Sequence, residues 1–104
     1  MKKFVFLYVG YEKEWAEANA SRRKEITDLW MKWFDEIKSH IVDGGNPFGP
    51  GQEVKHSETE ELPLDKNAVT GYSIINAESM DEAVKIAKSC PIIEGVRVYE
   101  AMSM

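Results

Sequence analysis

The last third of the chain constrains the fold most, because a strand, a helix and a second strand follow one another there almost without a break. Residues 69–77 (VTGYSIINA) are rich in β-branched and aromatic side chains, which favour a strand. Ser79 and Glu82 have the S-x-x-E spacing of a capping box, which predicts the start of a helix. An apolar stripe at helical spacing leads to Pro91, which ends the helix, and a second strand is predicted over 96–102. The sequence therefore predicts a compact β-α-β unit.

The first strand and the long helix are also marked by their apolar residues. Residues 3–9 (KFVFLYV) are apolar at both odd and even positions, as expected for a central strand of a sheet. Over 10–24 we expect a loop and a short helical turn, in which Trp15 covers the core. The segment from Lys24 to Val42 predicts a helix, because its large apolar side chains form one stripe at 100° per residue. The members of this stripe are Ile26, Leu29, Trp30, Trp33, Phe34, Ile37 and Ile41.

The middle of the chain carries weaker signals. Residues 43–51 contain a cluster of glycine and proline, which predicts a turn region inside one domain. Residues 52–60 alternate weakly around Val54 and His56 and are polar on both faces, which predicts an exposed strand at a sheet edge. Residues 62–67 supply the turn into the next strand.

The elements follow the order β-α-β-β-α-β, with strands near 3–9, 52–60, 69–77 and 96–102. Right-handed crossovers place 3–9 and 69–77 side by side at the centre of an antiparallel sheet, with both helices on one face. The sequence therefore predicts one α+β domain over 1–104 with a ferredoxin-like fold. The other face stays open although strand 3–9 is apolar on both sides, so we expect a second subunit to cover it.

The alternation of side chains along each strand assigns residues to the two faces. We expect the smaller aliphatic residues to meet the helices: Val5, Leu7, Ile75, Val96 and Val98. The open face then carries Phe4, Phe6, Tyr8, Tyr72, Ile74, Asn76, Arg97 and Tyr99. Such an aromatic face suits a dimer interface that encloses a small pocket, where tyrosine hydroxyls and an arginine orient an organic ligand. Alternatively, these residues do no more than pack two subunits together.

The charge balance restricts the partners. Eighteen acidic against thirteen basic side chains give a net charge of -5, which argues against nucleic acid or an anionic membrane as the main partner. The apolar run at the N-terminus is too short for a signal peptide or a membrane span. The single cysteine cannot form an internal disulfide, so a cytoplasmic location is expected.

Two histidines and the cysteine are the candidates for chemistry. His40 falls within the apolar stripe, where it is either a general base in apolar surroundings or a core-edge residue bonded to backbone. His56 lies near Glu58, and it either polarises a bound ligand or is an exposed edge residue. The pattern does not bring three ligands for a metal together, so neither a metal nor another cofactor is expected. Cys90 lies at a helix C-terminus, where the dipole disfavours a reactive thiolate.

Several segments match a known pattern when they are taken together. They are MKKFVFLYVG, Trp15, the W-x-x-W-F-x-x-I helix, the Gly44-Gly45 turn, and GYSIINAESMDEAVKIAKSCP followed by GVRVYEAM. Over nearly the whole chain, and most specifically in its last third, this pattern resembles the YCII-related proteins, in particular the DGPF branch. The resemblance implies a dimeric α/β-barrel, in which two ferredoxin-like subunits join sheet to sheet with a cleft beside each helix pair. The Asp-Gly-Pro-Phe segment that names the branch is absent, and residues 62–67 stand in its place.

Two functions are consistent with this pattern. The first is a homodimeric protein that binds a small aromatic or anionic molecule in a cleft beside the sheet, with Tyr8, His56, Tyr72, Asn76, Arg97 and Tyr99 as candidate ligand-binding residues. The second is a cofactor-independent enzyme of the same superfamily, of oxygenase, isomerase or lyase type, that uses a histidine or tyrosine in the cleft. The sequence contains no convergent acid-base pair, which favours the first. A histidine pointing into a cavity beside a tyrosine or arginine would favour the second.

Overall fold

The structure of the chain is a computed structural model that describes residues 1–10, 16–91 and 94–104. Its elements in chain order are β1 (Lys2–Val9), α2 (Ala20–Glu36), the 3₁₀ turn η1 (Lys38–His40), β2 (Ile41–Asp43), β3 (Gly51–Val54), β4 (Thr59–Leu62), β5 (Val69–Ala77), α3 (Met80–Lys88) and β6 (Gly95–Glu100). Trp15, which we expected to cover the core, lies outside the described residues.

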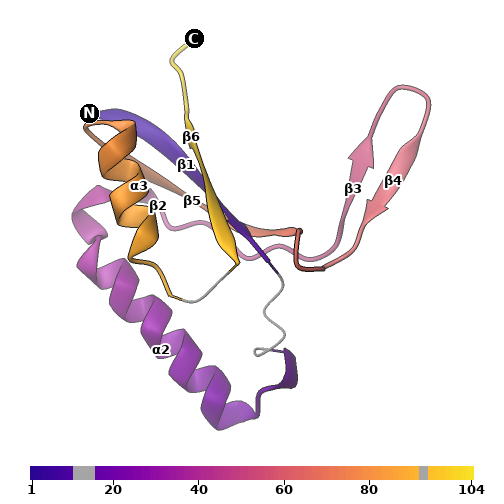
Figure 1. Ribbon diagram of the computed structural model, residues 1–104, viewed down its shortest axis with the longest axis horizontal. Coiled ribbons are helices and arrows are strands. Elements are labelled where there is room, and N and C mark those ends of the chain that lie inside the picture. The colour runs from indigo at the N-terminus through magenta and orange to yellow at the C-terminus, as the bar shows by residue number, and fades with distance from the viewer. Residues whose placement is uncertain (11–15, 92–93) are drawn as a thin grey trace.

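Four of the strands form one antiparallel sheet in the order β2-β5-β1-β6. In β1, Phe4 lies opposite Ile75 of β5 on one side and Glu100 of β6 on the other. The short strand β2 pairs with the outer edge of β5. Both helices lie on the same side of this sheet (Figure 1). The predicted α+β, ferredoxin-like fold is confirmed, with β1 and β5 side by side at the centre.

The β5-α3-β6 unit forms with the predicted cap at Ser79, but the side chain of Glu82 bonds one residue before the N-cap that a capping box specifies. The side chain of Ser79 accepts a hydrogen bond from the backbone N–H of Glu82, at 3.2 Å. The carboxylate of Glu82 in turn accepts from the backbone N–H of Glu78, at 3.1 Å. Two backbone donors that the helix itself cannot satisfy are therefore bonded, which fixes the point at which α3 leaves β5.

The long helix α2 is displaced from its predicted position at both ends. It begins at Ala20 because the side chain of Asn19 accepts a hydrogen bond from the backbone N–H of Arg22, at 2.8 Å. It ends at Glu36, and Ile41, which we predicted to be helical, pairs with Ile75 as part of β2. Ile41 has the spacing of the helical stripe, but a β-branched residue fits the apolar pattern of a strand equally well. None of the described helices is long and apolar enough to cross a bilayer.

Residues 52–60 do not form the predicted edge strand. They contribute to a hairpin, in which β3 and β4 pair only with each other as a second, two-stranded sheet. The backbone N–H of Lys55 donates to the carbonyl of Glu58, at 2.8 Å, and this bond closes the turn. The hairpin stands away from the body of the molecule (Figure 1), and all residues of its strands are exposed. The place in the main sheet that we predicted for residues 52–60 is taken by β2, which pairs with β5.

The face assignment of β1 is wrong, and the register explains why. Phe4 and Phe6 are fully buried, and Tyr8 is 8% exposed, all within the core beneath the helices. Residues that lie opposite one another point to the same face of a sheet, and the fully buried Ile75 lies opposite Phe4. Val5 therefore belongs to the open face, as does every second residue of β1. Because β1 is apolar at every position, its own sequence does not distinguish the two faces.

The face assignments of Ile75 in β5 and of the residues of β6 are confirmed. Ile75 is fully buried, and Val96 and Val98 pack against the core. Arg97 and Tyr99, which alternate with them, are exposed on the other face. In β6 polar and apolar positions alternate clearly, so the period-2 pattern identifies the buried face. In β5 the fully buried Ser73 interrupts this pattern.

Trp33 joins the long helix to the rest of the core. Its side chain is 2% exposed, and its indole N–H donates to the hydroxyl of Ser89, at 2.9 Å. That hydroxyl donates to the carbonyl of Ile86, at 2.7 Å. The indole is thus buried without leaving its polar group unsatisfied, and it connects α2 to the C-terminal end of α3.

Candidate ligand-binding cleft

A cleft of about 780 Å³ lies between α2, the adjacent ends of β1 and β5, and residues 44–48. Sites for small organic molecules usually have volumes of roughly 300–1,000 Å³. Most of the lining side chains are apolar or aromatic, and Arg23, Thr27 and Thr70 are among the polar residues that line it. This is the composition expected of a site that holds a small organic molecule and orients it through few polar contacts.

Three aromatic residues, Tyr8, Trp30 and Phe34, form one wall of the cleft. Trp30 and Phe34 are four residues apart in α2 and therefore lie on one face of the helix. The rings of Tyr8 and Trp30 meet edge to face with their centroids 5.3 Å apart, and Trp30 and Phe34 are 6.2 Å apart. Because these rings pack against one another, their faces are held in fixed orientations.

Residues 44–48 form a second wall, which is bonded to β5. The backbone N–H of Phe48 donates to the carbonyl of Thr70, at 2.8 Å, and the ring of Phe48 stacks on that of Tyr72 at 5.6 Å. Gly45 has a φ of 80°, and a Cβ at this position would overlap the carbonyl oxygen of Tyr72. A residue with a side chain cannot take this place without moving the wall, so glycine is required here.

Asp43 fixes the start of this wall. One oxygen of its carboxylate accepts from the backbone N–H of Gly45, at 2.8 Å. The other accepts from the hydroxyl of Tyr72, at 3.3 Å. The Tyr72 hydroxyl is therefore bonded to a structural carboxylate, although the residue itself lines the cleft.

The hydroxyl of Tyr8 belongs to a buried hydrogen-bond chain. It lies 2.8 Å from the hydroxyl of Ser73, which is fully buried and donates to the carbonyl of Gly44, at 2.7 Å. Burial raises the pKa of Tyr8 to about 12; the bond with Ser73 offsets part of this rise, and nearby Cys90 adds to it. Tyr8 is therefore a neutral phenol near neutral pH, which rules it out as a ready general base.

Two of the six predicted site residues line the cleft, and four lie elsewhere. Tyr8 and Tyr72 line it. Asn76 of β5 and Arg97 and Tyr99 of β6 belong to the open face of the sheet, whereas His56 is exposed in the turn of the β3–β4 hairpin.

The guanidinium at the cleft belongs to Arg23. Arg23 lines the cleft near the start of α2, and its Nη2 donates to the backbone carbonyl of Ala16, at 3.4 Å. From the sequence we predicted that Arg97 is the arginine beside the aromatic site. Arg97 belongs to β6 and lies on the open face of the sheet, away from the helices. Sequence reasoning missed Arg23 because it placed the helix start at Lys24. The Asn19 cap was the signal that could have found it.

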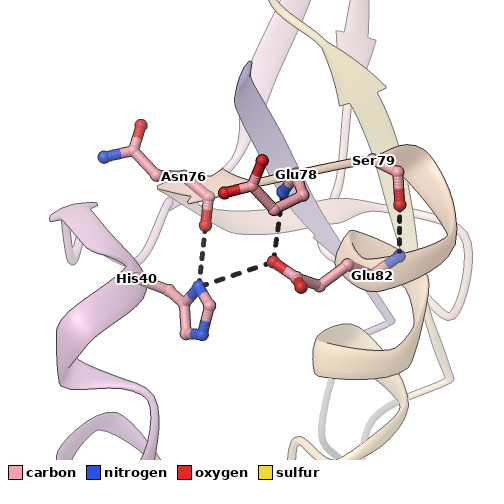
Figure 2. Close-up of polar contacts among 5 residues, drawn as sticks. All are labelled: His40, Asn76, Glu78, Ser79 and Glu82. Carbon is pink, nitrogen blue, oxygen red and sulfur yellow. Dashed lines mark hydrogen bonds and ion pairs between the residues drawn. The ribbon is translucent and has the colours of Figure 1, made fainter. Parts of the chain in front are cut away.

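His40 has a structural position, which Figure 2 shows together with its partners. Its Nδ1 lies 2.9 Å from the backbone carbonyl oxygen of Asn76 and 3.9 Å from Oε1 of Glu82. Both of these oxygens accept, so Nδ1 carries the proton and donates to Asn76. The side chain connects η1 to the end of β5 and the start of α3. Neither His40 nor His56 is among the described residues that line the cleft.

The described residues contain no group of three or more His, Cys, Asp and Glu side chains that could hold a metal ion. Cys90 packs against the core, and burial raises the pKa of its thiol. A protonated, half-buried thiol is a poor nucleophile, as its position at the end of the helix predicts.

In its overall fold the chain is similar to 5-chloro-2-hydroxyhydroquinone dehydrochlorinase (TftG) from Burkholderia phenoliruptrix AC1100, solved in complex with 2,5-dihydroxybenzoquinone. The similarity covers 96% of this chain and 93% of that chain, with a TM-score of 0.60 and 17% sequence identity. No family model matches the chain, and no curated protein matches it. At this identity the shared property is the fold alone, the ferredoxin-like arrangement of two helices on one face of a four-stranded antiparallel sheet.

Proposed function

We propose that the chain is a YCII-related protein that acts as a homodimer and binds a small aromatic or anionic molecule in the cleft. The observation that carries this proposal is the cleft itself, whose 780 Å³ volume suits one or two rings. Its wall of Tyr8, Trp30 and Phe34 offers ring faces and edges to a flat ligand. Arg23 supplies a positive charge and a planar group at the same cleft.

The fold neighbour supports this class of ligand. That protein was solved in complex with 2,5-dihydroxybenzoquinone, a flat ring that carries several oxygens. A molecule of that shape stacks on aromatic side chains and accepts hydrogen bonds from a guanidinium. We extend the chemical class to this chain, and not the reaction.

The homodimer is proposed from the open face of the sheet. This face carries the aliphatic residues Val5, Leu7 and Ile74 together with Tyr99, whose side chain is 56% exposed. An apolar sheet face of this kind is rarely left in water, and a second copy would cover it sheet to sheet. In this arrangement Asn76 and Arg97 contact the partner subunit, and the cleft stays accessible on the helix side.

An enzyme is the alternative, and the fold neighbour, a dehydrochlorinase by name, favours it. The described lining of the cleft favours binding instead, because it includes no His, Cys, Asp, Glu or Lys. Tyr8 keeps its proton. Near neutral pH these residues therefore include no ready general base, so a reaction that begins with proton abstraction has no agent among them.

Calorimetric titration with phenol, hydroquinone, benzoate and salicylate tests the proposal. We expect at least one of these compounds to bind the wild type, and Trp30→Ala to weaken its binding about tenfold through the loss of ring contacts. Met31→Ala is the matched control, because Met31 is the next residue of α2 and is 65% exposed. An equal loss in both variants, or no binding by the wild type, would contradict the proposal. Chromatography of the bound compound after incubation separates the two functions, since an enzyme would return a changed compound.

A further inference from the structure

The direction of the hydrogen bonds at Tyr8 is fixed by the atoms involved. The carbonyl oxygen of Gly44 can only accept, so the single hydroxyl proton of Ser73 lies on the 2.7 Å bond between them. The 2.8 Å contact between Ser73 and Tyr8 must then use the proton of Tyr8. Tyr8 donates to Ser73, and Ser73 donates to Gly44.

This order leaves the Oη of Tyr8, a residue that lines the cleft, able to accept a further hydrogen bond. Its Oη has lone pairs that the bond to Ser73 does not use, and in the described part of the chain no N–H or O–H donates to them. Ser73 is fully buried, so bulk water does not compete for its hydroxyl. The pKa of about 12 keeps the proton on Tyr8 across the physiological range, so the direction of the chain does not reverse.

Resting on the proposed function, we infer that the cleft selects aromatic ligands that present a neutral hydroxyl or N–H donor to Tyr8 Oη. A phenol satisfies this oxygen. A methyl ether or a phenolate places lone pairs against lone pairs, which leaves both oxygens without a proton between them. Ser73 is the positioning residue, because its bond to Gly44 determines where the proton of Tyr8 points.

Calorimetric titration of the full chain with hydroquinone, 4-methoxyphenol and 1,4-dimethoxybenzene tests this inference, because these rings lose their hydroxyl donors one at a time. We expect hydroquinone to bind at least tenfold more tightly than the dimethyl ether. The monomethyl ether keeps one donor and one added methyl group, so we expect its affinity to stay close to that of hydroquinone. A steady fall with each methyl group would attribute the preference to bulk and overturn the inference.

Two variants test the direction of the bonds. Tyr8→Phe removes the acceptor, and Ser73→Ala frees the proton of Tyr8 to turn toward a ligand. In both variants the ratio of the affinity for hydroquinone to that for 1,4-dimethoxybenzene should therefore fall toward one. Met31→Ala should keep the wild-type ratio. A tenfold preference that persists in Tyr8→Phe would overturn the inference, even if Ser73→Ala failed to fold. If the wild type bound hydroquinone and its dimethyl ether equally well, the inference would be overturned and the proposed function would stand. If none of the aromatic compounds bound, both would be overturned.

Discussion

The same strands form both faces of the four-stranded sheet, but the helices of the chain cover only one of them. On the helix-covered face, Phe4, Phe6 and Ile75 are fully buried by the chain itself. On the open face, Arg97 is exposed and Tyr99 is 56% exposed. The chain itself therefore buries one face, and we propose that a second subunit covers the other.

The side chains differ between the faces in kind as well as in burial. On the covered face, Tyr8 meets the rings of Trp30 and Trp33 edge to face, with centroids 5.3 and 6.4 Å apart. The open face receives the aliphatic Val5 and Leu7 from the same strand. On the covered face α2 supplies ring partners to Tyr8. Apolar content alone does not decide which side of a strand becomes the core.

The largest expected effect comes from placing a charge on each face in turn. Phe6→Glu should abolish folding, because it removes a buried ring and places a carboxylate in the core, at a cost comparable to the whole stability of about 5–15 kcal/mol. Leu7→Glu, one residue further along β1, should leave the subunit folded and shift it from dimer to monomer. Near-ultraviolet circular dichroism reports the folding, and sedimentation reports the association.

These two variants also provide the contrary outcome. If Phe6→Glu were a folded monomer and Leu7→Glu were unfolded, the two faces would have been assigned the wrong way round. A wild type that sediments as a monomer at micromolar concentration would remove the dimer from the proposal.

Trp33→Ala tests how much the packing of α2 on the covered face contributes to the stability of the fold. We expect a loss of about 3–5 kcal/mol in the free energy of unfolding, because the variant leaves a cavity where the buried indole packs. Met31→Ala, on the exposed side of the same helix, should change it by less than about 0.5 kcal/mol. Denaturant titration measures both, and similar losses would mean that the helix does not bury the face described.

The pH dependence of stability tests the burial of Tyr8. The pKa of Tyr8 rises from 10.0 to about 12 on folding, so the unfolded chain loses this proton first as the pH increases. Stability should therefore fall between pH 10 and 12, by about 1.4 kcal/mol per pH unit. Other groups also titrate in this range, so the quantity to compare is the difference in slope between the wild type and Tyr8→Phe. Equal slopes would mean that the Tyr8 hydroxyl is not buried as described.

The smallest effect is expected for Arg97→Ala, which tests whether ligand binding belongs to the covered side. Arg97 lies on the open face, so benzoate should bind this variant within about twofold of the wild type, provided that the wild type binds it. Arg23→Ala should weaken the same binding about tenfold, because Arg23 lines the cleft. A dependence on Arg97 alone would move the site to the open face.

The sequence by itself determined the β5-α3-β6 unit and the fold class. The S-x-x-E capping box, the β-branched and aromatic content of 69–77 and Pro91 are local signals, and each acts within a few residues of the structure that it sets. The order of elements then restricts the topology, because crossovers between parallel strands are right-handed. None of these inferences requires knowing which residues meet across the sheet.

The tertiary structure decided the rest, because it depends on partners far away in the chain. Ile41 becomes a strand residue only when the edge of β5 is there to pair with it. The face of Tyr8 is set by register against β5 and by rings from α2, since its own strand is apolar throughout. The cleft gathers residues from α2, both central strands and the segment 44–48. A site assembled from such distant segments leaves no local pattern in the sequence, and packing alone specifies it.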